Sequence, residues 1–590
     1  MSQWKRYALA IFAVFTSVGV SFLTPLVLAE VIDAIIGRTR PLALPAPILR
    51  WVDLRGGVDF LAHNLWLMAL ALLILNLMGG GLQYMRGRMT ATASDNIMKS
   101  LRDRLYSHIQ VLSFDYHQRT MTGDLIQRCT SDVDTLRQFL ANQFVEVFRT
   151  VFMVVIALSL MLSKHARLTA VSMMLVLPLF LCAYLFFRWV QKVFLVCDEA
   201  EGVMSAVLQE NLAGVRVVRA FARQQYEVEK FGKVHEDLHK KSVRLCDLLS
   251  IYWPSADLLS MVQVCITLVY GIYLAASGEI TVGDMTVFVS YTGMLLWPVR
   301  QLGRILSDFG RSLVSMGRLD EILCQPAEKE DADCFDAPIN KDIEFRNVAF
   351  SYDGGKEVLK DVSFTVQAGQ TVAILGATGS GKSTIVMLLQ RLYELQKGEI
   401  RIGGVDIQKI RKAHLRSHVG LILQEPFLYS RSMKRNIGIA REDATDEMLY
   451  DAARTAHAHE FTEGFENGYE TLVGERGVTL SGGQMQRTAI ARTLLKQNDI
   501  LIFDDSLSAV DTETDAMIRG ALKRKNAGLT TLIISHRLTT LMDADKILVL
   551  KDGTIAQQGT HDELLAQEGL YRQIYSIQTA LEEELEADAS

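Results

Sequence analysis

The feature that most constrains this chain is a series of long apolar stretches in its first 323 residues. There are six of them, at residues 7–36, 64–82, 139–162, 168–190, 249–276 and 285–302. Each is near or above the roughly 20 residues that an α-helix needs to cross about 30 Å of hydrocarbon. Six such stretches predict a polytopic α-helical membrane domain of six long helices over residues 1–323.

The connections between these stretches predict how the domain is oriented. Residues 83–138 and 191–248 are charged and have helical periodicity, so we expect the spans to continue as helices beyond the bilayer. The first connection holds eight Lys and Arg residues, and Lys5 and Arg6 precede the first span. The positive-inside rule therefore places the N-terminus and both long connections in the cytoplasm, although two basic residues in an outer connection oppose it. Six spans place the C-terminal half in the cytoplasm too.

The composition excludes several classes of protein. The net charge of −6 gives no electrostatic reason to expect nucleic-acid binding, which calls for a basic surface. The seven cysteines are scattered and form no CxxC pair, so we expect neither a disulfide framework nor a zinc site. The first apolar stretch exceeds the roughly 7–15 residues of a signal-peptide core. We expect it to be a retained span of the cytoplasmic membrane, with no peptidase domain before it.

A change in composition marks the boundary between two domains. Residues 325–340 are polar and acidic and contain two prolines, which is typical of a linker, and we place this linker at 324–341. Residues 342–578 have the pattern of a soluble α/β domain. The acidic residues 579–590 are predicted to form a solvated tail.

A glycine-rich loop follows a strand predicted at residues 371–376. It matches the pattern G-x-x-x-x-G-K-[ST] and consists of Gly376, Ala377, Thr378, Gly379, Ser380, Gly381, Lys382, Ser383 and Thr384. Between a strand and a helix, such a loop surrounds phosphate groups with backbone amides at the helix N-terminus. We therefore expect a P-loop nucleotide site in which Lys382 contacts the β- and γ-phosphates and Ser383 binds Mg²⁺.

A second apolar strand is predicted at residues 500–504, and it ends in the carboxylate of Asp504. An acid in this position, downstream of a P-loop, is expected to hold the Mg²⁺ of the nucleotide. Asp504 and Ser383 are therefore predicted to be metal ligands of one ATP site.

The most specific motif lies between these two segments. It consists of Leu480, Ser481, Gly482, Gly483 and Gln484, and it precedes a predicted helix. With the motifs above, it makes almost the whole chain resemble the ATP-binding cassette family. Ser481 and the glycine amides at the helix N-terminus form a second anion site. In the family, this signature closes on ATP held by the other nucleotide-binding domain, so the resemblance implies a head-to-tail dimer around two ATP molecules.

Further positions are carried over from the family one at a time. Tyr352 resembles the aromatic residue that stacks on adenine, and Gln424 resembles the glutamine that contacts Mg²⁺ and the attacking water. His536 resembles the histidine that contacts the γ-phosphate. Residues 508–511 resemble the loop that contacts the opposite nucleotide-binding domain, and residues 474–475 resemble an exporter segment that touches the coupling helices.

One position departs from the family pattern. The residue after Asp504 is normally Glu, whose carboxylate polarises the hydrolytic water, but here it is Asp505. The Asp side chain is one methylene shorter than that of Glu. A catalytic group that is misplaced by about 1 Å lowers the reaction rate on the order of 10²-fold. We expect Asp505, Gln424 and His536 to be the catalytic residues of a site that binds ATP but hydrolyses it slowly. The alternative is that Asp505 is a conservative substitution for Glu and still supports ATP hydrolysis.

An intact signature beside Asp505 resembles one subunit of the heterodimeric bacterial multidrug exporters. Because the signature serves the partner's P-loop, a homodimer would hold two impaired sites. A heterodimer could hold one competent and one slow site. The resemblance therefore favours a second half-transporter as partner, with Glu after its own P-loop-associated Asp and a deviant signature.

The membrane half resembles the type I exporter domain, or type IV fold. Residues 113–134 and 210–224 resemble its coupling-helix regions, through which closure of the nucleotide-binding domains opens the membrane cavity outward. Ionisable residues near membrane spans are candidates for substrate contact. They are Glu30, Asp33, Glu146, Arg149 and Asp257. Solvation at the membrane boundary explains these residues equally well.

The resemblance implies an ATP hydrolase coupled to transport, with ATP and Mg²⁺ as cofactors, that exports amphipathic or lipophilic small molecules. Two alternatives stay open. One is a lipid flippase or importer of the same fold, and the other is a nucleotide-gated regulator or channel that transports nothing. Uptake and efflux assays in liposomes separate these three functions.

Overall fold

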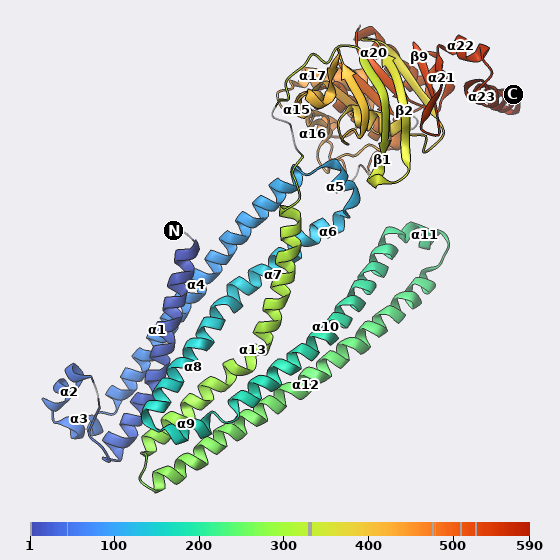
Figure 1. Cartoon of the computed structure of the whole chain (residues 1–590). Coiled ribbons are helices and arrows are strands. Elements are labelled where there is room, and N and C mark those ends of the chain that lie inside the picture. The colour runs from blue at the N-terminus through green and yellow to red at the C-terminus, as the bar shows by residue number, and fades with distance from the viewer. Residues whose placement is uncertain are drawn as a thin grey trace. The chain divides into compact units, whose positions relative to one another are not determined.

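The computed structural model describes residues 3–43, 45–328, 333–474, 477, 479–507, 510–525 and 528–589. The chain divides into two units. The first consists of Met1–Val111 and Thr120–Gln325, and the second of Leu112–Arg119 and Pro326–Ser590. In Figure 1 the first unit is built of long helices, and the second combines strands with shorter helices.

Long helices form the first unit. They are α1 (Gln3–Glu30) with its extension η1 (Val31–Ile36), α4 (Trp66–Gln110), α8 (Phe144–Lys164), α10 (Val176–Ala213), α12 (Gln224–Ala276) and α13 (Val282–Leu323), and the short helix α9 (Ala166–Ser172) lies between α8 and α10. The shorter elements are α2 (Ala46–Asp53), α3 (Gly57–His63), α6 (Thr122–Gln127), η2 (Arg128–Asp132), α7 (Val133–Gln138), η3 (Phe139–Gln143) and α11 (Val215–Ala220). The sequence analysis does not predict α2 and α3.

Five helical segments of the described residues are long and apolar enough to cross a membrane. They are Gln3–Ile36, Trp66–Gln110, Thr122–Lys164, Ala166–Ala213 and Gln224–Ala276. They contain four of the six predicted stretches entirely and a fifth, 64–82, from residue 66 onward. Helices α4 and α12, with 45 and 53 residues, continue far beyond the apolar parts. The sixth stretch lies on α13 but is not among the five segments. Polar residues such as Arg300 and Gln301 lower its mean hydropathy.

The predicted fourth span is interrupted between α9 and α10. At this break, the side chain of Gln263 on α12 accepts a hydrogen bond from the Leu175 amide at 2.9 Å and donates one to the Val171 carbonyl at 3.0 Å. Hydrocarbon offers no partners for backbone polar groups, so a break in a membrane helix needs such a replacement. Gln263 is fully buried and supplies these hydrogen-bond partners from a helix about 90 positions away in the sequence.

The second unit contains two sheets. One has four strands in the order β2-β1-β4-β5, and the other has six in the order β10-β9-β3-β8-β7-β6. The strands of the first sheet are β1 (Ile343–Ser351), β2 (Glu357–Val366), β4 (Lys397–Ile402) and β5 (Val405–Asp406). Those of the second are β3 (Thr371–Gly376), β6 (Val419–Ile422), β7 (Ile500–Asp504), β8 (Thr530–Ile534), β9 (Lys546–Lys551) and β10 (Thr554–Gly559).

Four neighbouring strands of the larger sheet, β3, β8, β7 and β6, run parallel. The described residues of β3 and β7 are almost entirely buried, as expected for strands that are covered on both faces. In open parallel sheets, ligands bind beyond the carboxyl ends of the strands. The predicted P-loop, Gln424, Asp504 and His536 all lie at or just after these ends.

Helices complete the second unit. They are α5 (Phe114–Arg119), α14 (Lys382–Leu389), α15 (Lys412–His418), α16 (Met433–Gly438), α17 (Asp446–Thr455), α18 (His459–Glu463), α19 (Gly482–Leu494), α20 (Thr512–Lys525), α21 (Leu538–Met542), α22 (His561–Ala566) and α23 (Leu570–Ala589). The short 3-10 turns are η4 (Tyr352–Gly354), η5 (Ile407–Lys409) and η6 (Gly468–Glu470). Residues 579–589, predicted as a tail, belong to α23.

Candidate functional site

The P-loop connects β3 to α14, as the sequence predicts. Gly379 and Gly381 have φ angles of +81° and +100°, a region that side chains with a Cβ rarely adopt. A Cβ on Gly381 would also lie 2.5 Å from Cδ2 of Leu359. Only glycine therefore fits the turn that leads into α14.

Lys382 lies inside this loop. Its Nζ donates hydrogen bonds to the carbonyls of Gly376 at 2.7 Å and Ala377 at 3.0 Å. Burial lowers the pKa of the Lys382 ammonium, while the nearby carboxylates of Asp505 and Asp504 act in the opposite direction. The ammonium is thus held where it faces the acidic end of β7.

Ser383 and Asp504 form a pair of oxygen donors beside the P-loop. The Ser383 hydroxyl donates to Oδ1 of Asp504 at 2.9 Å, and Asp504 is buried. Burial raises the pKa of Asp504, and the charge of Asp505 adds to this effect. A hydroxyl and a carboxylate that meet in this way fit the preference of Mg²⁺ for oxygen ligands.

Asp505 has a left-handed backbone, with φ +47°. Its amide donates to the Ile534 carbonyl of β8 at 2.9 Å, which fixes the backbone to the neighbouring strand. Its carboxylate accepts a hydrogen bond from Nε2 of Gln424 at 3.0 Å. The structure thus brings Asp505 and Gln424 together, two residues that are 81 positions apart in the sequence.

His536 and Tyr352 lie on segments that adjoin this group. His536 is exposed and comes two residues after Ile534, the residue that pairs with Asp504 between β8 and β7. The hydroxyl of Tyr352 lies 3.0 Å from Oγ1 of Thr384, the last residue of the P-loop motif. The ring of Tyr352 therefore stands beside the start of α14.

The signature segment caps helix α19. The Ser481 hydroxyl accepts a hydrogen bond from the Gln484 amide at 3.3 Å, and Oε1 of Gln484 accepts one from the Ser481 amide at 2.9 Å. This reciprocal capping box fixes the helix N-terminus. The first turn contains no acidic residue, and a Cβ on Gly482 would meet nothing within 4 Å. The N-terminal end is thus sterically open and free of negative side chains in its first turn.

Three predicted residues, Glu475, Ser508 and Ala509, lie outside the described residues. Of the loop at 508–511, the structure describes Val510 and Asp511. The Asp511 carboxylate accepts a hydrogen bond from the Thr514 amide at 2.8 Å, which lowers the pKa of Asp511. Gly474 donates from its amide to the hydroxyl of Thr479 at 3.2 Å.

Helix α5, within the first predicted coupling region, packs on the nucleotide-binding unit. Phe114 contacts Tyr393 edge to face at 5.5 Å, and Tyr393 contacts Tyr352 in the same way at 5.2 Å. A cavity of about 560 Å³ is lined by residues of this segment together with Tyr352 and Tyr393. The aromatic contacts connect residues 112–119 to Tyr352, the predicted adenine-stacking residue. No sequence motif indicates this connection.

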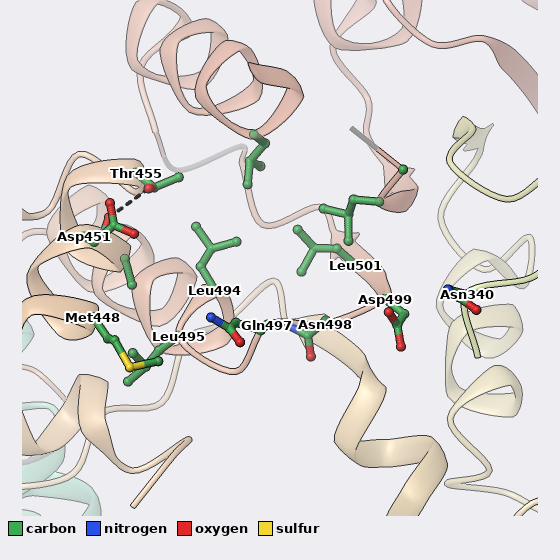
Figure 2. A pocket seen from close by; sticks show the side chains of 14 residues that line it. Asn340, Met448, Asp451, Thr455, Leu494, Leu495, Gln497, Asn498, Asp499 and Leu501 are labelled. Atoms are coloured by element: carbon green, nitrogen blue, oxygen red, sulfur yellow. Dashed lines mark hydrogen bonds between the residues drawn. The ribbon is translucent and has the colours of Figure 1, made fainter. Parts of the chain in front are cut away.

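A second cavity of this unit lies elsewhere. It has a volume of about 550 Å³ and is lined by residues such as Asp451, Leu494, Asp499 and Leu501 (Figure 2). Asp499 and Leu501 mark the amino end of β7, opposite to Asp504. Ligands of parallel sheets bind at the carboxyl ends, so the P-loop end is the better candidate for the nucleotide site.

Comparison with known proteins agrees with this geometry. The family described as "ABC transporter transmembrane region" matches residues 7–299, and "ABC transporter" matches residues 359–508. YgaD of Bacillus subtilis (strain 168), a candidate multidrug export ATP-binding/permease protein, is 34% identical over 562 residues. The alignment covers 94% of this chain and 97% of YgaD. The chain belongs to the ABC transporter family.

Two further matches cover nearly the whole transporter. A candidate multidrug export ATP-binding/permease protein of Staphylococcus aureus (strain NCTC 8325 / PS 47) is 32% identical over 587 residues, which are 97% of this chain and 98% of that protein. The solved structure of a bacterial Atm1-family ABC exporter with ATP bound has a TM-score of 0.82 and 26% identity, covering 97% of this chain and 99% of that one. The transporter is therefore a multipass membrane protein with the exporter fold, which hydrolyses ATP in coupling to transport and works as a dimer.

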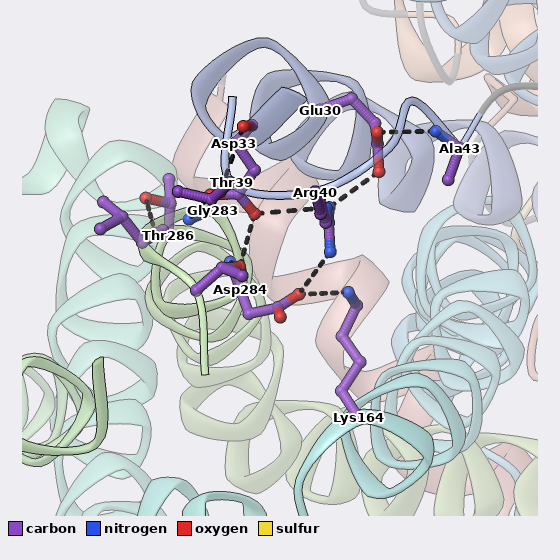
Figure 3. Close-up of polar contacts among 11 residues, drawn as sticks. Glu30, Asp33, Thr39, Arg40, Ala43, Lys164, Gly283, Asp284 and Thr286 are labelled. Carbon is purple, nitrogen blue, oxygen red and sulfur yellow. Dashed lines mark hydrogen bonds and ion pairs between the residues drawn. The ribbon is translucent and has the colours of Figure 1, made fainter. Parts of the chain in front are cut away.

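Two of the predicted substrate-contact candidates belong to a polar network in the membrane unit. Arg40 pairs with Glu30 at 2.8 Å and with Asp33 at 3.5 Å (Figure 3). It also pairs with Asp284 at 3.5 Å, and Asp284 pairs with Lys164. Glu30 and Asp33 are thus bound by the transporter's own side chains, which join α1, α8 and α13.

The other three candidates are paired as well. Asp257 pairs with Arg300 of α13. Glu146 binds Arg149, three residues further on α8, at 2.7 Å, as their spacing on one helix face allows. Glu146 also binds Arg86 of α4 at 2.9 Å. Arg86 is not among the residues predicted from the sequence, although its place just after the apolar stretch 64–82 is a signal that could have identified it.

Proposed function

We propose that the transporter exports amphipathic or lipophilic small molecules as one half of a heterodimer, and that its own P-loop site hydrolyses ATP slowly. Family membership and the exporter fold support ATP-driven transport, and the relatives named for multidrug export support this substrate class. The geometry around Asp505 carries the proposal of a slow site.

The P-loop residues have distinct tasks in this proposal. Lys382 binds the β- and γ-phosphates, and Tyr352 stacks on adenine. Gly376, Thr378, Gly379, Ser380, Gly381 and Thr384 belong to the loop that surrounds the phosphates. Ser383, Asp504 and Gln424 are the ligands for Mg²⁺, which neutralises charge that develops on the phosphates. On the second chain's ATP, the residues that act are Ser481, Gly482, Gly483 and Gln484.

Asp505 is the proposed base, assisted by Gln424 and His536. Its short side chain could reach the hydrolytic water only if its backbone moved by about 1–1.5 Å. The hydrogen bond from the Asp505 amide to Ile534 opposes this movement, because it ties the backbone to β8. The hydrogen bond from Gln424 holds the carboxylate itself. Both contacts support slow hydrolysis at this site.

The deciding experiment measures ATP hydrolysis by the purified chain alone and together with the product of the adjacent reading frame. We expect low turnover alone and high turnover for the pair, since the intact signature of this chain completes the partner's site. Fast ATP hydrolysis by the chain alone would contradict the proposal of a slow site. ATP-driven accumulation of an amphipathic dye in inverted vesicles tests export separately.

A further inference from the structure

Two neighbouring cavities of the membrane unit share two arginines. The larger, of about 380 Å³, is lined by residues of α4, η3, α8 and α13. The smaller, of about 70 Å³, is lined by residues of α1, α4, α8 and α13. Arg86 and Arg149 line both cavities, so the two cavities adjoin at these residues.

The charges around the larger cavity do not balance. Arg86 and Arg149 share the single carboxylate of Glu146, and their side chains are 24% and 34% exposed. Arg304, an exposed residue, lines the same cavity, and no described residue forms an ion pair with it. The cavity lining therefore carries three positive charges and one negative charge.

Other polar groups near the cavity do not remove this excess. The nearby carboxylate of Asp308 accepts a hydrogen bond from Gln143 at 3.0 Å and pairs with Arg311 at 2.5 Å. Gln301 lines the cavity and is 7% exposed, and its Oε1 has no hydrogen-bond partner among the described residues. An amide can exchange O and N by a flip, so Gln301 can offer a ligand either a donor or an acceptor.

Arg86 and Arg149 are only partly exposed, and two such guanidinium groups on one carboxylate leave a positive charge that an anion would compensate. The guanidinium group also matches carboxylate, sulfate and phosphate groups through two parallel hydrogen bonds. Seven of the twelve residues that line the smaller cavity are apolar, among them Val14, Phe22 and Met153. A molecule that fits both cavities has an anionic head and an apolar tail.

We propose that this transporter carries amphipathic anions, whose head group binds Arg86, Arg149 and Arg304 while a short segment of the apolar chain enters the smaller cavity. This inference rests on the proposed export function and narrows its substrate class. The anion can come from a lipid headgroup or from a soluble amphiphile, since the chemistry of the head is the same.

The test is a binding measurement that needs no ATP. The full-length transporter in phosphatidylcholine nanodiscs is titrated with 12-(NBD-amino)dodecanoic acid and with its uncharged primary amide, and binding is followed by fluorescence anisotropy. The amide has the same chain and fluorophore, so it corrects for partitioning into the bilayer. We expect the acid to bind about 10-fold or more tightly than the amide, as for a hydrogen bond to a charged group.

The variants Arg149→Gln and Arg86→Gln should bring the acid-to-amide ratio of affinities close to 1. Arg88→Gln is the matched control, because Arg88 is exposed on the same helix and lines neither cavity. Glu146→Gln should keep or increase the ratio, an outcome that a purely structural role of the ion pairs does not give.

Competition then separates the two sources of the anion. Displacement by unlabelled phosphatidylglycerol supports a lipid substrate, and displacement by dodecanoate supports a soluble one. A wild-type ratio near 1, or displacement by neither, would overturn the proposal. If export fails in vesicles while the ratio stays high, the proposed function is wrong and the anion site stands.

Discussion

At the P-loop, the side chain of Lys382 binds backbone carbonyls, that of Ser383 binds Asp504, and that of Asp505 binds Gln424. In the signature, the side chains of Ser481 and Gln484 each bind the backbone amide of the other residue. The P-loop region is therefore a connected group of polar side chains that ends in a short carboxylate. The signature is an intact half-site with an open helix N-terminus. Under the proposed function, this difference means that one chain supplies parts of two different ATP sites, and that the short carboxylate belongs to only one of them.

The largest expected effect comes from the signature, because it serves the competent site of the proposed heterodimer. Gly482→Asp places a negative charge in open space at the N-terminus of α19. Asp is favourable for the helix itself, but it faces the partner's γ-phosphate, where like charges cost several kcal/mol. We expect steady-state ATP hydrolysis by the heterodimer to fall at least about 100-fold.

Gly482→Ala is the control for this variant, since it adds a methyl group and no charge. It should retain most of the activity. If Gly482→Asp hydrolyses ATP as fast as the wild-type pair, the signature does not serve the competent site and the comparison fails.

An intermediate effect is expected at Tyr352. Removing an aromatic ring that stacks on a base costs about 1–3 kcal/mol, so Tyr352→Ala should weaken ATP binding at this chain's P-loop about 10-fold. Tyr352→Phe keeps the ring but loses the contact of the hydroxyl with Thr384 at 3.0 Å, and should bind nearly as well. Equilibrium binding of radiolabelled ATP without Mg²⁺ measures both. Equal losses of ATP affinity in the two variants would show that the hydroxyl, and not the ring, contributes to ATP binding.

The smallest effect is expected outside both regions, at Glu328 in the linker. Its carboxylate binds Arg416 at 2.6 and 2.8 Å and Lys412 at 3.3 Å. Burial raises the pKa of Glu328, but these cations outweigh burial and lower the pKa below its ordinary value. A lowered pKa means that the ion pairs stabilise the fold above the unfolded pKa and lose this effect as the pH falls through the folded one.

Glu328→Gln should therefore lower the free energy of unfolding by about 1 kcal/mol at pH 7, or the unfolding midpoint by about 2–4 °C. The difference from wild type should shrink below about pH 4.5, the ordinary pKa of the residue. Thermal unfolding of the full-length transporter at pH 7 and pH 4 measures it, with Glu466→Gln, an exposed position, as control. A difference that grows in acid would contradict this interpretation. Neither variant should alter the ratio between the two ATP sites.

The fold and the nucleotide site follow from the sequence because their signals are local. The P-loop and the signature are contiguous, and the strand that ends in Asp504 is a short apolar run. The parallel order of β3, β8, β7 and β6 then brings Gln424 and His536 to the same edge as Asp504. The pattern thus predicts which residues gather there, although their roles remain proposals.

The membrane unit was harder to predict because its polar contacts join distant helices. Gln263 seals the break before Leu175 from another helix, and Arg86 reaches Glu146 across 60 positions. Apolar length alone predicts neither the break nor the ion pair. Helix α5 is a similar case, since its attachment to Tyr393 depends on a tertiary contact between residues far apart in the sequence.

The most direct test of the slow P-loop site is the ATP turnover of Asp505→Glu in the full-length chain without its partner. The longer side chain restores the missing methylene. Glu adopts the left-handed backbone conformation at φ +47° less readily than Asp. The turnover of the separate variant Lys382→Ala is subtracted as the blank. After this subtraction, we predict that Asp505→Glu hydrolyses ATP about 10- to 100-fold faster than wild type. A wild-type chain that already turns over as fast as Asp505→Glu would contradict the account.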